Sequence, residues 1–207
     1  MCHPAVGAVA TIAGTAAQMK ASKDQGKAVQ EAAFQLICKA IEEIDMTTHE
    51  GEHPRLGAVD VCPFVPLKGV TMDDCVDLAQ SLAYRVGTDC NVPTFLYGSA
   101  ALHQEKNLLS TIRKGQYEGL QARLSGGETP HSEHTRYPDF GSREWGEEAQ
   151  KSGAITIGAR SILVAYNVNI DETDAIVAKK IGSLVRSTGR LVKKEDGRRM
   201  RVPGMLV

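Results

Sequence analysis

The stretch LGAVDVCPFV, residues 56–65, decides the fold of this chain. It is short and apolar, with Pro54 before it and Pro66 and Gly69 after it. A run of this kind between turn-forming residues is typical of a buried strand. The sequence therefore predicts a strand here, to be covered by helices from the flanking segments.

Helices and further strands alternate around this stretch. Apolar residues recur at helical spacing over residues 29–44, and a second helix is expected to begin at Thr71, whose hydroxyl can cap the first turn. The other expected elements are a strand at 92–97, a short helix at 105–113, strands at 154–159 and 162–170, and a helix at 171–189. This order predicts an α/β (α+β) fold, with a mixed β-sheet and helices packed on one side.

A polar stretch of 29 residues, 125–153, shows neither helical nor strand periodicity. Loops of that length in compact domains are usually functional or disordered. The sequence therefore leaves open whether part of this stretch has a function.

Composition and charge narrow the function classes. With 207 residues, 42% hydrophobic and 24% charged, the chain has the composition of a soluble globular protein. Residues 186–201 carry a local charge of +5, interpreted as a solvated flank, so no nucleic acid is expected. The apolar run at 4–19 is too short and broken to span a bilayer, so no membrane partner is expected.

The five cysteines are scattered without CxxC pairs. An odd number in this arrangement indicates neither a disulfide framework nor a zinc knuckle, and a cytoplasmic location fits best. Core packing is the favoured role for Cys62 and Cys75, over that of a nucleophile.

The segment HEGEH, residues 49–53, matches the zincin pattern, which requires a helix. Gly51 and Pro54 disfavour that helix, so no metal is expected. As a loop, the segment places His53 just before the buried strand, where an imidazole can act as a general acid or base. The alternative is a surface histidine without a role. Solvated roles are favoured for the other histidines of polar stretches, which are His49, His131 and His134.

Five segments together resemble a known family. They are IDMTTHEGEHPRLGAVDVCPFVPLKGVTMDDCVDLAQSL at 44–82, VPTFLYGSAA at 92–101, IRKGQYEGL at 112–120, PDFG at 138–141 and GAITIGARSILVAYNVNI at 153–170. The chain is similar to the formiminotransferase N-terminal subdomain of glutamate formimidoyltransferases and the formimidoyltransferase-cyclodeaminase family. The resemblance implies transfer of a formimino group from N-formiminoglutamate to tetrahydrofolate as co-substrate, with release of glutamate.

The resemblance also implies site residues. The histidine of the family's GEHPR motif is the catalytic acid or base, here His53. The folate-binding segment corresponds to Gly141, Ser142, Arg143, Glu144, Trp145, Gly146, Glu147, Glu148, Ala149, Gln150, Lys151, Ser152 and Gly153.

Because both substrates are anionic, Arg55, Arg143 and Lys151 are candidate carboxylate partners, and Arg55 is preferred since it lies next to His53. Trp145 would stack on the folate or anchor its loop.

The resemblance further implies a domain organisation. Residues 1–28 form a divergent segment, 29–170 the N-terminal subdomain, and 171–207 the start of a truncated C-terminal subdomain. Family members are homodimers or larger, so a homodimer or pairing with a separate C-terminal subdomain is expected. The alternatives are a non-catalytic folate-binding or regulatory subunit and an inactive truncated gene product. A one-walled groove and exposed strands would leave a marginal monomer.

Overall fold

The computed structural model describes residues 23–51, 53–67, 69–164, 170–171, 173–185, 190–193 and 199–202. The chain divides into two compact units, one up to Ile162 and one from Leu163. Residues 172 and 186–189 of the expected helix at 171–189, and residues 165–169 of the expected strand at 162–170, lie outside the described residues.

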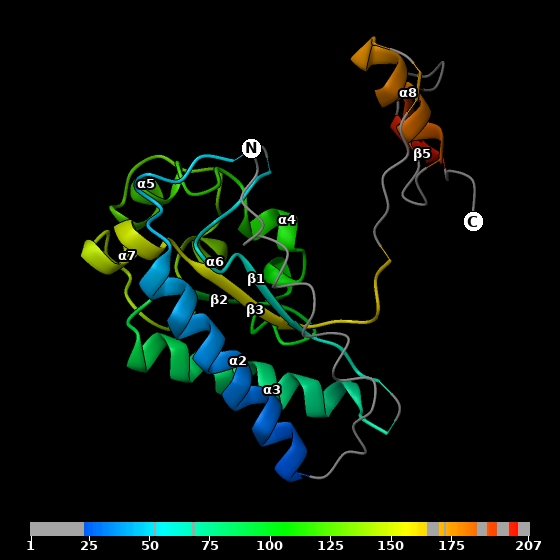
Figure 1. Ribbon diagram of the computed structural model, residues 1–207. Coiled ribbons are helices and arrows are strands. Elements are labelled where there is room, and N and C mark those ends of the chain that lie inside the picture. Colours follow the sequence, from blue (N-terminus) through cyan, green and yellow to red (C-terminus); the bar gives the residue numbers. More distant parts are fainter. Residues whose placement is uncertain are drawn as a thin grey trace. The chain divides into compact units, whose positions relative to one another are not determined.

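A parallel sheet of three strands forms the centre of the first unit (Figure 1). Its strands are β1 (Val61–Phe64), β2 (Thr94–Gly98) and β3 (Ile155–Ala159), in the order β1-β3-β2. Both β1 and β2 pair with β3 in parallel. The α/β class is confirmed, but the expected mixed sheet is wrong for the described strands of this unit. Residues 161–164 are exposed and outside any strand, so no return strand follows β3 there.

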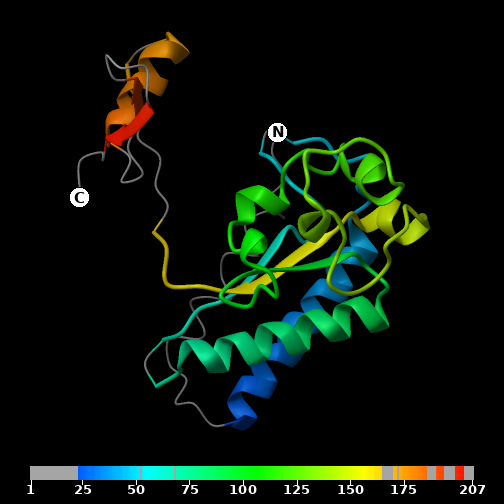
Figure 2. The same ribbon diagram turned by 180° about the vertical axis from the view of Figure 1, so that it is seen from behind.

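Two long helices cover the same face of this sheet, as expected (Figures 1 and 2). They are α2 (Lys23–Glu43) and α3 (Met72–Asp89). Thr71 caps α3 in a capping box with Asp74, which explains why the helix begins where the sequence predicts. Apolar side chains of both helices share one buried cluster with alternate residues of the strands, including Ile37, Leu82, Leu96 and Ile157.

The opposite face is covered too, by short elements, so the expectation of helices on one side only is wrong. These elements are η3 (Gln104–Lys106), α4 (Leu109–Ile112), α5 (Leu120–Leu124), α6 (Glu133–Arg136) and α7 (Glu147–Ser152). Phe95 and Tyr97 of β2 belong to a second buried apolar cluster on this face. They point to this face because successive strand residues face opposite sides of a sheet. A parallel sheet is normally buried on both faces, and this one follows that rule.

Buried cations hold the second face together. Lys106 Nζ donates to Asp139 Oδ1 at 2.7 Å and to the Tyr137 carbonyl at 3.1 Å. The Arg123 guanidinium lies over the Phe95 ring, 4.1 Å from its centroid, and donates to backbone carbonyls. Because each buried charge has hydrogen-bonding partners, the desolvation cost is offset.

The second unit consists of α8 (Ala175–Val185) and an antiparallel pair, β4 (Arg190–Lys193) and β5 (Arg199–Val202). The helix lies within the expected range 171–189, of which 186–189 are outside the described residues. Its apolar side chains Ile176, Val177, Ile181, Leu184 and Val185 are exposed.

Candidate functional site

The loop that contains His53 is held by an ion pair between Asp60 and Arg113. Asp60 Oδ1 accepts from the Leu56 backbone N–H at 2.9 Å, and Asp60 Oδ2 pairs with Arg113. The same guanidinium donates to the Pro54 carbonyl. Pro54, the residue after His53, is therefore anchored, and the described residues of the loop are not helical, as the sequence predicts.

Burial raises the pKa of Asp60, while the Leu56 N–H and the Arg113 guanidinium oppose that rise. Burial disfavours the carboxylate, and the hydrogen bonds and the positive charge favour it. The Leu56 N–H and the Arg113 guanidinium therefore both favour the carboxylate form of Asp60.

The 141–153 segment meets this loop through the backbone. Ala58 N donates to the Ser152 carbonyl at 2.8 Å, and Ala154 N donates to the Leu56 carbonyl at 3.1 Å. Gly153 permits the approach: its φ is +69°, and a Cβ there would lie 2.4 Å from the Leu56 oxygen. Two segments almost a hundred residues apart are therefore neighbours.

Tyr117 joins the two segments on one side. Its N–H donates to the Arg55 carbonyl at 3.0 Å, and its hydroxyl donates to the Gln150 carbonyl at 2.6 Å. Its ring lies 5.8 Å from the Arg55 guanidinium carbon and 5.7 Å from the Trp145 ring, measured between centroids for the two rings. Arg55, Tyr117 and Trp145 therefore form a row of one cation and two aromatic rings between the His53 loop and the 141–153 segment.

The two histidines of the loop differ in environment. His53 is exposed, with its ring available to solvent and to a ligand. His49 is half-buried, its Nδ1 is buried without a hydrogen-bond partner, and its carbonyl accepts from Arg55. Of the two, His53 is the better placed for proton transfer with an incoming molecule.

Each of the three candidate carboxylate partners already has a contact. Arg55 pairs with Glu118 at 2.5 Å between Nη1 and Oε1, with 14% of the Arg55 side chain and 61% of the Glu118 side chain exposed. Arg143 lies over the Tyr137 ring at 5.9 Å, and Lys151 Nζ donates to the Glu42 carbonyl at 3.3 Å. An anion reaching Arg55 would therefore compete with an exposed Glu118.

The backbone contacts between these segments lie at the amino edge of the sheet, where the parallel strands begin. Gly57 bridges to Gly153 just before β3, and Ser142 N donates to the Asn91 carbonyl just before β2. His53 and Arg55 precede β1. The structure therefore brings both ends of the predicted folate segment and the histidine loop to one edge.

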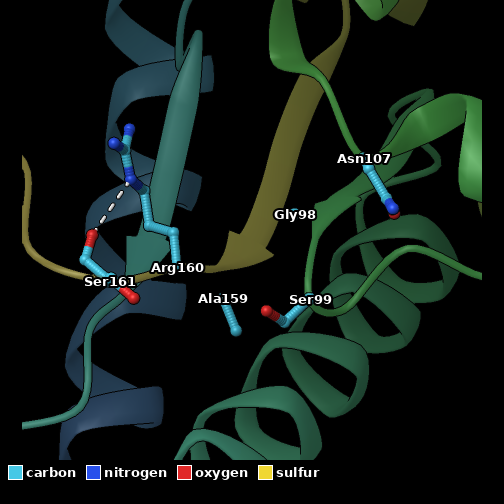
Figure 3. Close-up of a pocket in the computed structure, with 6 residues that line it drawn as sticks. All are labelled: Gly98, Ser99, Asn107, Ala159, Arg160 and Ser161. Carbon is cyan, nitrogen blue, oxygen red and sulfur yellow. Dashed lines mark hydrogen bonds between the residues drawn. The ribbon is translucent and has the colours of Figure 1, made fainter. Parts of the chain in front are cut away.

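An open hollow of about 420 Å³ lies at the opposite, carboxyl edge (Figure 3). It is lined by Gly98, Ser99, Asn107, Ala159, Arg160 and Ser161. Arg160 Nε donates to the Ser161 carbonyl at 3.3 Å. In Figure 3 these two residues stand on one side and Asn107 on the other, so the polar side chains do not converge on one point.

Tyr117, Asp60 and Arg113 are the functional residues that sequence reasoning missed. Tyr117 lies in the segment IRKGQYEGL, which was identified as a family match but given no role. Asp60 and Arg113 also lie in matched segments, 44–82 and 112–120, but they are 53 positions apart and no local pattern links them. Only the folded chain places them under the His53 loop.

Fold and site together define an α/β domain with a histidine loop, an aromatic bridge and a glycine-bounded segment at one sheet edge. Residues 8–160 match the formiminotransferase domain, N-terminal subdomain, and the chain belongs to that family. The match includes residues 8–28, which lie before the expected start of the subdomain at residue 29.

The relatives carry names that agree with the family. The chain is 43% identical over 163 residues to a glutamate formimidoyltransferase of Streptococcus pyogenes serotype M1, covering 79% of this chain and 51% of the relative. It is 44% identical over 166 residues to one of Thermoplasma acidophilum, with the same two coverages. A formimidoyltransferase-cyclodeaminase of Rattus norvegicus is 39% identical over 181 residues, or 87% of this chain and 31% of the relative. The chain thus spans about half the length, or less, of these relatives.

Among the described residues, no group of three or more His, Cys, Asp or Glu side chains is placed to hold a metal ion. Within that same part of the chain, no helix has the length and apolar character needed to cross a membrane.

Proposed function

We propose that this chain contributes the histidine loop and the folate segment to a glutamate formimidoyltransferase. The reaction transfers the formimino group of N-formiminoglutamate to tetrahydrofolate and releases glutamate. The observation that carries the proposal is the pairing of residues 56–58 with 152–154 at the amino edge of the sheet. That pairing supports the proposal because it joins the segment that follows His53 to the end of the 141–153 segment.

His53 is proposed as the proton-transfer residue. Attack of a folate nitrogen on the amidine carbon gives a tetrahedral intermediate, and its collapse requires the departing glutamate nitrogen to gain a proton. An imidazole suits this step because it changes protonation near neutral pH. Two observations support this role. His53 is exposed, and Arg113 donates to the carbonyl of Pro54, the residue that follows His53.

The segment 141–153 is proposed to bind tetrahydrofolate, with Trp145 beside the ring system. Trp145 packs on Tyr117 and borders the second apolar cluster. A half-buried indole in this place can extend an aromatic surface to a pterin or benzoyl ring. Arg55 is proposed to meet a substrate carboxylate by exchanging its exposed partner Glu118, because guanidinium groups pair with carboxylates in a fork geometry.

The test supplies the carboxyl-terminal subdomain of the Streptococcus pyogenes relative as a separate chain. We expect the mixture to form glutamate from N-formiminoglutamate only when tetrahydrofolate is present. If this chain binds tetrahydrofolate but the mixture stays inactive while the relative itself turns over, the non-catalytic binding function replaces the transferase. If neither binding nor turnover occurs, the proposal fails as a whole.

A further inference from the structure

Two cysteines that the proposed function does not use lie face to face. Cys38 is on α2, and Cys90 is the residue that ends α3. Their sulfur atoms are 3.7 Å apart, although the residues are 52 positions apart in the sequence. Both side chains are half-buried. The two thiols therefore share a hydrogen bond at the surface between the helices that cover the sheet.

We propose that Cys38 and Cys90 form a reversible disulfide, so that this pair is an oxidation site of the protein. A disulfide requires the sulfurs to move roughly 1.7 Å closer, since the bond length is about 2.05 Å. The backbone on the Cys90 side ends a helix and turns into Asn91, which has a φ of +52°. The approach thus involves a helix end and one helix side chain, without breaking either helix.

Burial of Cys90 and its hydrogen bond with Cys38 raise the pKa of Cys90 to about 12. The two thiols contact each other directly, so either sulfur can attack an oxidant first, and both orders give the same disulfide. In the order with Cys38 first, Cys90 is the resolving thiol.

The oxidant is a low-molecular-weight disulfide such as oxidised glutathione. Cys38 sulfur attacks one glutathione sulfur, the glutathione disulfide bond breaks, and one glutathione leaves as a thiol. Cys90 sulfur then attacks the Cys38 sulfur, the mixed disulfide breaks, and the second glutathione leaves with the remaining proton. Two protein thiols are oxidised and one glutathione disulfide is reduced to two thiols.

The other described cysteines provide matched controls. Cys62 is 7% exposed and Cys75 is 3% exposed, and burial raises the pKa of both, that of Cys62 to about 12. Unlike Cys38 and Cys90, both are buried and therefore lack access to an oxidant. Cys2 lies outside the described residues and is removed by Cys2→Ser in every protein tested.

The experiment treats the folded chain with oxidised glutathione and follows its intact mass and peptide map. We expect a loss of about 2 Da and a peptide joining Cys38 to Cys90. Cys90→Ser and Cys38→Ser should each instead keep one glutathione on the remaining cysteine of the pair. Cys62→Ser and Cys75→Ser should behave as the parent.

A second readout follows the fold. Because the bond would close a long loop in the unfolded chain, the oxidised protein should melt about 5–10 °C higher, and a thiol reductant should reverse the shift. Three results would each overturn the proposal: a disulfide through Cys62 or Cys75, glutathione retained on the parent without resolution, or no reaction of the folded chain.

Discussion

The two edges of the central sheet differ in how their residues are connected. At the amino edge, Arg113 binds the Pro54 carbonyl and Asp60, and Tyr117 links Arg55 to the 141–153 segment. At the carboxyl edge, backbone hydrogen bonds join Gly98 to Asn107 and Ser99 to Ala159, and Arg160 donates to the carbonyl of its neighbour Ser161. Interlocked residues hold a fixed geometry, which a reacting site requires.

The amino edge is not the usual position of a ligand in a parallel sheet. In open α/β sheets, ligands commonly bind outside the carboxyl ends of the strands. Here the sequence resemblance and the contacts both favour the amino edge, whereas the hollow has the common position. The edges therefore make competing predictions, and variants at each edge separate them.

The largest expected effect is on turnover, at His53. In the complemented enzyme, His53→Ala should lower kcat by about 10²- to 10⁴-fold, because general acid–base catalysis contributes roughly that much. The control at the same loop is His49→Ala, which should cost much less. Arg160→Ala at the carboxyl edge should leave kcat within a factor of about three. Equal losses for His53→Ala and Arg160→Ala would remove the distinction between the edges.

Two glycine variants test the comparison through the free energy of unfolding and the response to tetrahydrofolate. Gly153 at the amino edge and Gly98 at the carboxyl edge both have φ above +60°, and an added Cβ at either would lie 2.4 Å from a carbonyl oxygen. Each change to Ala should cost about 2–4 kcal/mol in urea unfolding. Only Gly153→Ala should also abolish the response of Trp145 fluorescence to tetrahydrofolate. Loss of that response in Gly98→Ala would count against the amino edge.

A smaller effect is expected from Arg113→Ala, which leaves the half-buried Asp60 without its ion pair. The cost should be about 1.5–3 kcal/mol at pH 7, measured by urea unfolding. Since the folded pKa of Asp60 is already raised, loss of Arg113 raises it further. A raised carboxyl pKa costs stability as pH rises through it, so the difference from wild type should shrink when pH falls and Asp60 is protonated. Arg143→Ala, which removes an exposed guanidinium, should cost under about 0.5 kcal/mol.

The smallest expected effect is at Glu118. Glu118→Gln removes the competing carboxylate from Arg55 while keeping the side-chain shape. The ion pair is exposed on the Glu118 side and is worth about 0.2–1 kcal/mol. The KM for N-formiminoglutamate should therefore fall by up to about fivefold, with kcat nearly unchanged. A rise in KM would show that Glu118 positions Arg55 and does not compete for it.

The long elements could be predicted from the sequence because their signals are local. Thr71 and Asp74 form the capping box that starts α3, and the apolar runs became β1, β2 and β3 with shifted ends. The helices α6 and α7 were not predicted within the polar stretch 125–153. They have four and six residues, too few to display a helical period.

The rest of the site depends on contacts between distant residues, which no local pattern encodes. His53, Arg55 and the 141–153 segment came from the family resemblance, and their roles stay predictions. The Asp60–Arg113 pair, the Tyr117 bridge and the Cys38–Cys90 contact each join residues more than 30 positions apart. The expected strand at 162–170 is not formed at 162–164, where the side chains are exposed.

The amino-edge site is tested most directly by amide hydrogen exchange with and without saturating tetrahydrofolate. We expect protection of residues 141–153 and 49–58, with a change in the fluorescence of Trp145, the single tryptophan of the chain. Residues 98, 99 and 159–161 around the carboxyl-edge hollow should exchange as before. Protection at the hollow, or unchanged exchange and fluorescence at the amino edge, would contradict the account.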